Sequence, residues 1–152
     1  MRCLIVDDSA DFANAARRLL ERDGTTVVDV ASTCAEALRY CEELRPDVAL
    51  VDVNLGSESG FDVTEQLHRS GSPTPPPVIL ISTHAEQDFA AMIADSPAIG
   101  FLSKMVLTDD AIRDLVDGRR MPAVGGPNGV ARPINESSFG KTTSETTVGP
   151  SP

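Results

Sequence analysis

The sequence predicts an α/β domain in which helices cover both faces of a doubly wound parallel sheet of five strands. Short apolar runs alternate five times with stretches of helical periodicity, which is the order expected of strand–helix repeats. The runs are rich in Val, Ile and Leu without polar alternation, as in strands buried on both faces. A length of 152 residues suits one domain. Right-handed crossovers would then place helices on both sides of the sheet.

The elements are expected in the following order. The strands are residues 3–6, 26–30, 48–53, 78–81 and 99–102. The helices that follow them are residues 11–22, 35–44, 61–67, 89–93 and 111–116. The first helix has the clearest apolar stripe, in which Phe12, Ala15 and Leu19 recur at spacings of three and four. Turn-forming residues such as Asp23 and Gly24 mark the joins between elements.

The composition changes after Gly118. Residues 119–152 contain five Pro, five Gly and eight Ser or Thr, with scattered apolar residues and no period. Such a segment buries too little apolar surface to offset the entropy lost on ordering. We therefore expect one domain over residues 1–118 and a disordered tail over residues 119–152.

The charge of the chain excludes several classes of function. The formal net charge is -10, and residues 1–118 hold 9 Lys and Arg against 21 Asp and Glu. An acidic body repels phosphate backbones, so we expect no direct binding to nucleic acid and do not favour a DNA-binding regulator. The three cysteines have no CxxC spacing, and no apolar run approaches the length of a membrane span. These features favour a soluble cytoplasmic protein with reduced thiols and no membrane contact.

Polar side chains follow most of the expected strands at the point where each strand ends. Asp7 and Asp8 follow the first strand, Asp52 lies at the end of the third, and Ser82 and Lys104 follow the fourth and fifth. The carboxyl ends of parallel strands share one edge, so these groups should converge. Neighbouring carboxylates need a cation between them, and an all-oxygen ligand set favours Mg²⁺ or Mn²⁺ over zinc. The pattern predicts a phosphoryl-transfer site with an aspartate as acceptor.

Four segments together resemble the receiver domain of two-component response regulators, in the stand-alone form. They are LIVDDS, PDVALVDVNLGSESGFD, PVILIS and GFLSK, all within residues 1–118. The resemblance implies the flavodoxin-like strand order 2-1-3-4-5 and phosphorylation of Asp52 by a sensor histidine kinase or histidine phosphotransfer protein. It further implies that Asp8, Asp52 and the backbone carbonyl of Asn54 bind Mg²⁺ directly, with Asp7 acting through water.

The same resemblance assigns a switch. Lys104 would pair with the phosphoryl oxygens, Ser82 would hydrogen-bond one of them, and Phe101 would turn inward and remodel a surface for a downstream protein target. A local charge change would thus bias a bistable packing arrangement. The family implies a signalling domain rather than an enzyme, with slow Mg²⁺-dependent autodephosphorylation.

The sequence departs from the family pattern at two places. Met105 follows Lys104 where receivers commonly have a proline in a cis peptide, and a cis bond is rare before other residues. Thr83 follows Ser82 where a small residue is common, and His84 comes next. We expect the departure at Met105 to alter the loop path and Thr83 and His84 to affect dephosphorylation.

Other functions fit parts of the pattern. One alternative is a phosphohydrolase that forms an aspartyl-phosphate intermediate, although in that family the acidic pair comes last along the chain. Another is a receiver that acts without phosphorylation.

Some of these residues also fit a purely structural role. Asp8 with Ser9 and Asp11 could cap the first helix, Ser82 could bond to backbone, and Phe101 could simply pack in the core.

Overall fold

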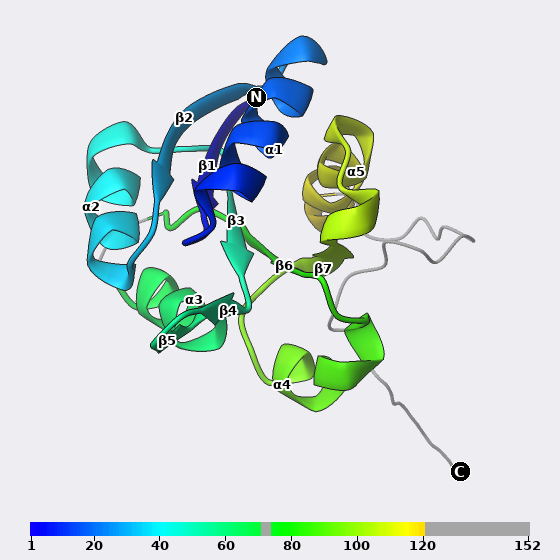
Figure 1. The fold of residues 1–152 in the computed structure, drawn as a ribbon. Coiled ribbons are helices and arrows are strands. Elements are labelled where there is room, and N and C mark those ends of the chain that lie inside the picture. The colour runs from blue at the N-terminus through cyan, green and yellow to red at the C-terminus, as the bar shows by residue number, and fades with distance from the viewer. Residues whose placement is uncertain (71–73, 121–152) are drawn as a thin grey trace, which may run out of the picture.

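The computed structural model describes residues 1–70 and 74–120, with side chains through Gly118 (Figure 1). A parallel sheet has the order β2-β1-β3-β6-β7, which is the predicted order 2-1-3-4-5 when its own strands are counted along the chain. Its strands are β1 Arg2–Val6, β2 Thr26–Ala31, β3 Val48–Asp52, β6 Val78–Ser82 and β7 Gly100–Ser103. The predicted fold class is therefore confirmed.

Helices connect the strands and cover both faces of the sheet. They are α1 Ala10–Arg22, α2 Cys34–Leu44, α3 Gly60–His68, α4 Ala90–Ala94 and α5 Asp109–Arg120. α1 and α5 lie on one face, and α2, α3 and α4 lie on the other (Figure 1). None of the helices in the described part of the chain has the length and apolar character needed to cross a bilayer.

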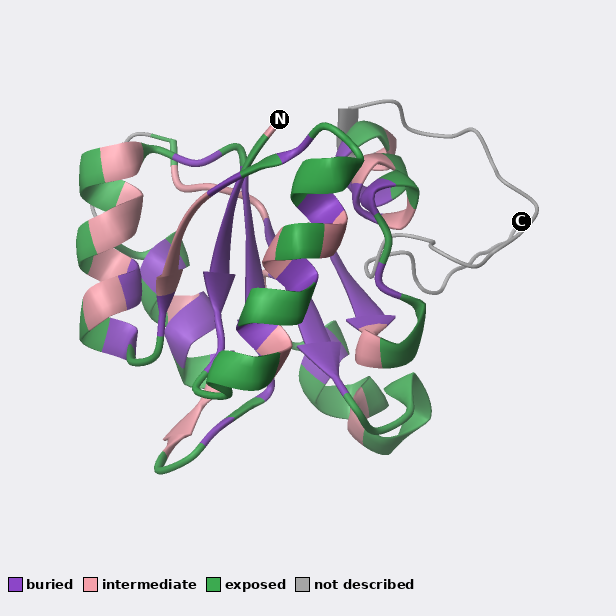
Figure 2. Cartoon of the chain, turned by 45° about the horizontal axis from the view of Figure 1, so that its top comes forward, coloured by how far each residue is buried: buried purple, intermediate pink, exposed green. Residues whose placement is uncertain are grey.

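Two hydrophobic cores follow from the alternation of side chains along the strands. In β1, Cys3 and Ile5 pack under α1 and α5, while Leu4 and Val6 pack under α2 and α3. β3 and β6 are buried along their whole length, as their unbroken apolar runs predict (Figure 2). The strands are thus packed on both faces, and the order of the sheet fixes where the residues at their ends lie.

Side-chain caps set where the helices begin. Ser9, Thr33 and Ser59 each accept a hydrogen bond from a backbone N–H in the first turn of α1, α2 and α3. α2 ends at Leu44 and its C-cap is Arg45, a non-glycine residue with a φ of 49°. The N-cap of α1 is Ser9, so Asp8 is not needed as a cap and its carboxylate remains available to the sheet edge.

The structure differs from the sequence expectations in three places. The segment after Asp52, where the sequence predicts no element between residues 53 and 61, forms a short hairpin of β4 Asn54–Leu55 and β5 Glu58–Ser59. The fourth helix is split into the 3-10 turn Glu86–Phe89 and α4, and a second 3-10 turn, Lys104–Val106, follows β7. α5 extends to Arg120, and the rest of the predicted tail, residues 121–152, lies outside the described residues.

Candidate functional site

Three carboxylates gather at the carboxyl edge of the sheet. β1 and β3 are neighbours, with Val6 opposite Val51, so the residues that end them lie side by side. One carboxylate oxygen from each of Asp7, Asp8 and Asp52 lies within 4.8 Å of the other two. Asp7 is 1% exposed and Asp52 is 7% exposed, whereas Asp8 is exposed. The cluster is therefore buried on the sheet side and open to solvent at Asp8.

Lys104 brings a cation into this cluster from the end of β7. Its Nζ lies 2.7 Å from Asp7 Oδ2 and 3.2 Å from Asp52 Oδ2, and its side chain is 11% exposed. The same ammonium lies 4.3 Å from the centre of the Phe12 ring, within the range of a cation–π contact. Three carboxylates and one ammonium leave two negative charges, which a divalent cation would balance.

A closed set of contacts fixes the position of Asp7 relative to Lys104. The Ser9 N–H donates to Asp7 Oδ1 at 2.8 Å, and Ser9 Oγ accepts from the Phe12 N–H at 3.3 Å. The Phe12 ring then returns to Lys104, which pairs with Asp7. The sequence indicates for Phe12 only a place in the apolar stripe of α1, since its contact with Lys104 depends on how distant segments pack.

The electrostatic environment shifts the pKa of two of these groups. Burial raises the pKa of the Asp52 carboxyl, and the charge of Asp7 adds to this effect, while the Asn54 N–H and Lys104 act in the opposite direction. Burial alone would lower the pKa of the Lys104 ammonium, but Asp7 and Asp52 raise it above its usual value. Lys104 therefore stays charged at neutral pH.

The acidic cluster has the chemistry of a site for a hard divalent cation. Its oxygens come from carboxylates, and neither His nor Cys takes part. The buried Asp7 Oδ2 has no well-formed hydrogen bond among the described residues, although Lys104 lies close to it. The residues present thus fit a metal. Asn54 reaches the cluster through its backbone N–H, which donates to Asp52 Oδ1 at 3.2 Å, and its carbonyl stays a predicted ligand.

Ser82 lies on the strand next to Asp52. β6 pairs with β3, with Asp52 opposite Ile81, so Ser82 is buried one position beyond that pair. Its Oγ accepts a hydrogen bond from the His84 N–H at 3.0 Å. The hydroxyl bonds to backbone in this state, and its predicted contact with a phosphoryl group stays a prediction.

Phe101 is buried in the core between the sheet and α4. Its ring centre lies 6.4 Å from that of Phe89, which in turn lies 6.1 Å from the rings of Phe61 and His84. Core packing is therefore what the structure shows for Phe101, and its role as a switch stays a prediction. The edge-on contact places His84 in the same aromatic cluster.

Two glycines let the chain after Asp52 fold closely over the site. A Cβ at Gly60 would lie 2.1 Å from the carbonyl oxygen of Asp52, and the Gly60 N–H donates to the Val53 carbonyl at 2.8 Å. Gly56 has a φ of 71°, and a Cβ there would lie 3.1 Å from Asp8 Oδ2. These positions accept only glycine without a shift of neighbouring atoms.

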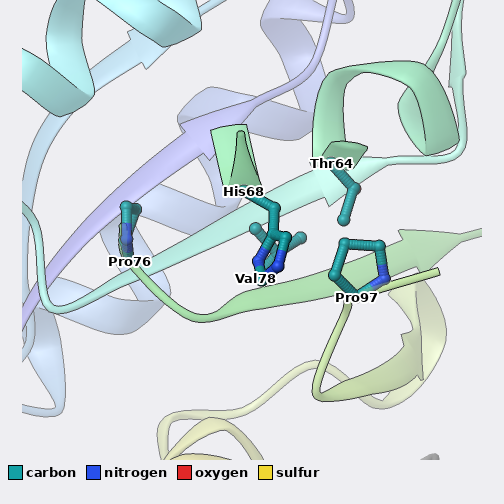
Figure 3. Close-up of a pocket in the computed structure, with 5 residues that line it drawn as sticks. All are labelled: Thr64, His68, Pro76, Val78 and Pro97. Atoms are coloured by element: carbon teal, nitrogen blue, oxygen red, sulfur yellow. The ribbon is translucent and has the colours of Figure 1, made fainter. Parts of the chain in front are cut away.

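A small hollow lies at the edge of the sheet opposite the acidic cluster (Figure 3). Val78, the first residue of β6, lines it together with Thr64, His68, Pro76 and Pro97. The Thr64 hydroxyl already donates to the Gly60 carbonyl at 2.7 Å. The hollow is small and offers few free polar groups, so the acidic cluster is the stronger candidate for a functional site.

Comparison with known families decides what kind of domain carries this cluster. Residues 3–117 match the family described as the response regulator receiver domain. The chain belongs to this family. The resemblance of the four sequence segments to a receiver domain is therefore confirmed, whereas the stand-alone form stays a prediction. The acidic cluster lies inside the matched region.

Curated relatives of this receiver include response regulators from several bacteria. The response regulator UvrY of Escherichia coli K12 is 31% identical over 121 residues, which cover 77% of this chain and 55% of UvrY. The response regulator GacA of Pseudomonas viridiflava is 31% identical over 105 residues, which cover 68% of this chain and 48% of GacA. The receiver chain thus spans about half the length of these two relatives.

Solved structures agree with the assignment. A CheY-like response regulator receiver domain protein from Methanospirillum hungatei superposes with a TM-score of 0.66 at 25% identity, covering 80% of this chain and 98% of that one. A LuxR-family two-component response regulator from Aurantimonas gives a TM-score of 0.68 at 26% identity, covering 77% of this chain and 85% of that one.

Proposed function

We propose that this receiver domain accepts a phosphoryl group on Asp52 in a Mg²⁺-dependent step of a phosphorelay. The proposal rests on the acidic cluster, in which one carboxylate oxygen from each of Asp7, Asp8 and Asp52 lies within 4.8 Å of the other two. The Lys104 ammonium lies beside them and pairs with Asp7 and Asp52. The donor would be a sensor histidine kinase or a histidine phosphotransfer protein. Membership of the receiver family supports this role.

The chemical step needs only groups that the site and the donor supply. A carboxylate oxygen of Asp52 forms a bond to phosphorus while the bond from phosphorus to the donor imidazole nitrogen breaks. The imidazole leaves with the electron pair of that bond and takes up a proton. Asp52 is a suitable acceptor because the Asn54 N–H binds one of its oxygens and Lys104 binds the other, so its orientation is fixed.

Asp7, Asp8 and Asp52 would hold the Mg²⁺, with Mn²⁺ as a substitute and the Asn54 carbonyl as a further ligand. Bound there, the cation would offset the negative charge of the carboxylates and of the incoming phosphoryl oxygens. Lys104 adds a second positive charge near Asp52 Oδ2. Hydrolysis of the acyl phosphate would return the domain slowly to its starting state.

The output of the domain would be binding to a downstream protein rather than to nucleic acid. Its net charge of -10 disfavours contact with phosphate backbones. Phosphorylation would draw the Ser82 hydroxyl and the Lys104 ammonium toward the new oxygens and so disturb the packing near Phe101. A cytoplasmic location suits this role and the free cysteines.

A labelling experiment tests the proposal. With Mg²⁺ and acetyl phosphate, intact-mass spectrometry should show one added phosphoryl group that is stable in acid and lost in alkali. Asp52→Asn should lose the label, because an amide oxygen is a poor nucleophile and the metal site loses a carboxylate. Asp62→Asn, which changes an exposed acid in the first turn of α3, should be labelled as the parent protein is.

Two results would contradict the proposal. Unchanged labelling of Asp52→Asn would place the acceptor elsewhere. Repeated turnover of a small phosphomonoester would favour the phosphohydrolase that the sequence left open as an alternative.

A further inference from the structure

The hairpin that follows Asp52 touches two of the three clustered carboxylates. At its start, the Asn54 N–H donates to Asp52 Oδ1 at 3.2 Å. At its turn, Gly56 lies so close to Asp8 Oδ2 that a Cβ would come within 3.1 Å of it. The hairpin therefore lies against two side chains of the cluster.

The far strand of this hairpin is attached to a different element, helix α2. Glu58 Oε1 accepts a hydrogen bond of 2.8 Å from the backbone N–H of Cys34, which is the first residue of α2 and lies 24 residues earlier in the chain. The first N–H groups of a helix lack partners within it and carry partial positive charge, so a carboxylate is a favourable acceptor there. Across the hairpin, Glu58 faces Leu55, which is buried.

We propose that Glu58 is a positioning residue for the metal site. By anchoring the hairpin on α2, it holds Asn54 and Gly56 against Asp52 and Asp8, and it touches neither the cation nor the phosphoryl group. This inference rests on the proposed Mg²⁺ binding. Because linkage is reciprocal, a cation bound at the cluster also stabilises the hairpin and the hydrogen bond at Cys34.

The chain contains a matched control at the same helix end. Glu36 Oε1 accepts hydrogen bonds from Ser32 N at 2.8 Å and Ser32 Oγ at 3.1 Å. Replacing either Glu36 or Glu58 removes one carboxylate that accepts hydrogen bonds at the start of α2. Glu58 binds across to α2 from the hairpin, whereas the Glu36 bonds stay within the turn that begins the helix.

Isothermal titration calorimetry with MgCl₂ on the full chain tests the proposal. For Glu58→Leu we expect affinity for Mg²⁺ to fall by about tenfold, the lower end of what loss of a supporting contact costs a metal site. Glu58→Gln keeps an acceptor oxygen of the same reach, so its affinity should stay within roughly threefold of the parent. Glu36→Leu should bind Mg²⁺ as the parent does, even if its Tm falls.

Amide hydrogen exchange gives a readout that does not depend on activity. In the parent protein and in Glu36→Leu, Mg²⁺ should slow exchange at both Asn54 and Cys34. In Glu58→Leu, Mg²⁺ at saturating concentration should slow exchange at Asn54 only, because the link to Cys34 is gone. If Glu58→Leu folds poorly, the measurements on the parent protein and on Glu58→Gln still decide the test.

The outcomes separate this inference from the proposed function. If the parent binds Mg²⁺ but the exchange of Cys34 does not respond, or if Glu58→Leu binds as tightly as Glu36→Leu, Glu58 is not a positioning residue and the proposed function stands. If the parent neither binds Mg²⁺ nor becomes labelled, both proposals fail.

Discussion

Asp52 is held in an environment that disfavours its charge. The side chain ends a fully buried strand and has Asp7 as a neighbour, and burial together with this second carboxylate raises the pKa of Asp52. Lys104 and the Asn54 N–H offset part of this effect. This incompletely compensated charge suits the proposed binding of a cation and a phosphoryl group at Asp52, and it lowers the stability of the unliganded fold.

The stability of Asp52→Asn tests this interpretation. A carboxyl whose pKa is raised on folding favours the folded state at low pH, and that contribution is lost as pH rises through the raised pKa. Without Mg²⁺ at pH 7, the variant should therefore gain about 1 kcal/mol in free energy of unfolding, since it removes a buried charge that Asp7 repels while Lys104 keeps Asp7 as its partner. This gain in free energy of unfolding should be smaller at acidic pH. Urea unfolding at both pH values measures it, and a less stable variant at pH 7 would contradict the interpretation.

At the scale of elements, the sequence predicts those helices and strands that are long enough to show a hydrophobic period. The apolar runs around Leu50 and Ile79 and the stripe that includes Leu19 have the periods of buried strands and of a helix, and the structure has these elements there. The two-residue strands of the hairpin are too short to show a period. The contact between Phe12 and Lys104 depends on the packing of α1 against the end of β7, which no local pattern reports.

The predicted site residues illustrate the same limit. Asp7, Asp8, Asp52 and Lys104 could be brought together by topology alone, because each follows a parallel strand at one edge. The supporting contact of Glu58 could not be predicted from topology, since it joins a hairpin to the start of a helix through one side chain.

Gly60 links the end of β3 to the start of α3, and its replacement tests how tightly these elements are joined. In Gly60→Ala the new Cβ would meet the backbone of Asp52 and Val53, at 2.1 Å from the Asp52 carbonyl oxygen and 2.8 Å from Val53 Cα. Neither atom can move alone, so we expect a loss of roughly 2 kcal/mol in free energy of unfolding and weaker Mg²⁺ binding. Denaturant unfolding and calorimetry measure the two effects.

The matched control for this substitution is Gly118 in α5, where a Cβ would meet nothing within 4 Å. Gly118→Ala should leave Mg²⁺ binding unchanged and raise the free energy of unfolding by about 0.5 kcal/mol, since alanine favours a helix. Equal stability of the two variants would show that the junction at Gly60 is not constrained by sterics.

At the scale of the whole molecule, the chain after β7 joins the two edges of the sheet. Lys104 pairs with the acidic cluster at the carboxyl edge. Asp109, which begins α5, accepts hydrogen bonds from the hydroxyl of Thr25, just before β2, and from Arg113 Nε at 2.7 Å. The segment between them carries Met105, which is 83% exposed. Both ends of this segment are thus fixed by buried acids. Between them Met105 and Val106 face solvent, while Leu107 is buried in the core.

The buried acid at the amino edge should respond to pH in the opposite sense from Asp52. Burial alone would raise the pKa of Asp109, but the Thr25 hydroxyl and Arg113 lower it below its usual value. Its contribution to stability is therefore present above an unfolded pKa of about 3.9 and is lost as pH falls through the lower folded pKa. Asp109→Asn should lose roughly 1–2 kcal/mol at pH 7, and the difference from the parent should narrow in acid.

Urea unfolding across pH 3 to 7 measures this dependence, with the exposed neighbour Asp110 replaced as Asp110→Asn for the control. Because Asp109 lies at the edge opposite the acidic cluster, Mg²⁺ should bind Asp109→Asn with unchanged affinity as long as α5 stays folded. A constant difference in stability across this pH range would mean that the contact works through packing rather than charge. Weakened Mg²⁺ binding in a fully folded Asp109→Asn would instead show that the segment from Lys104 to Asp109 transmits strain between the two edges.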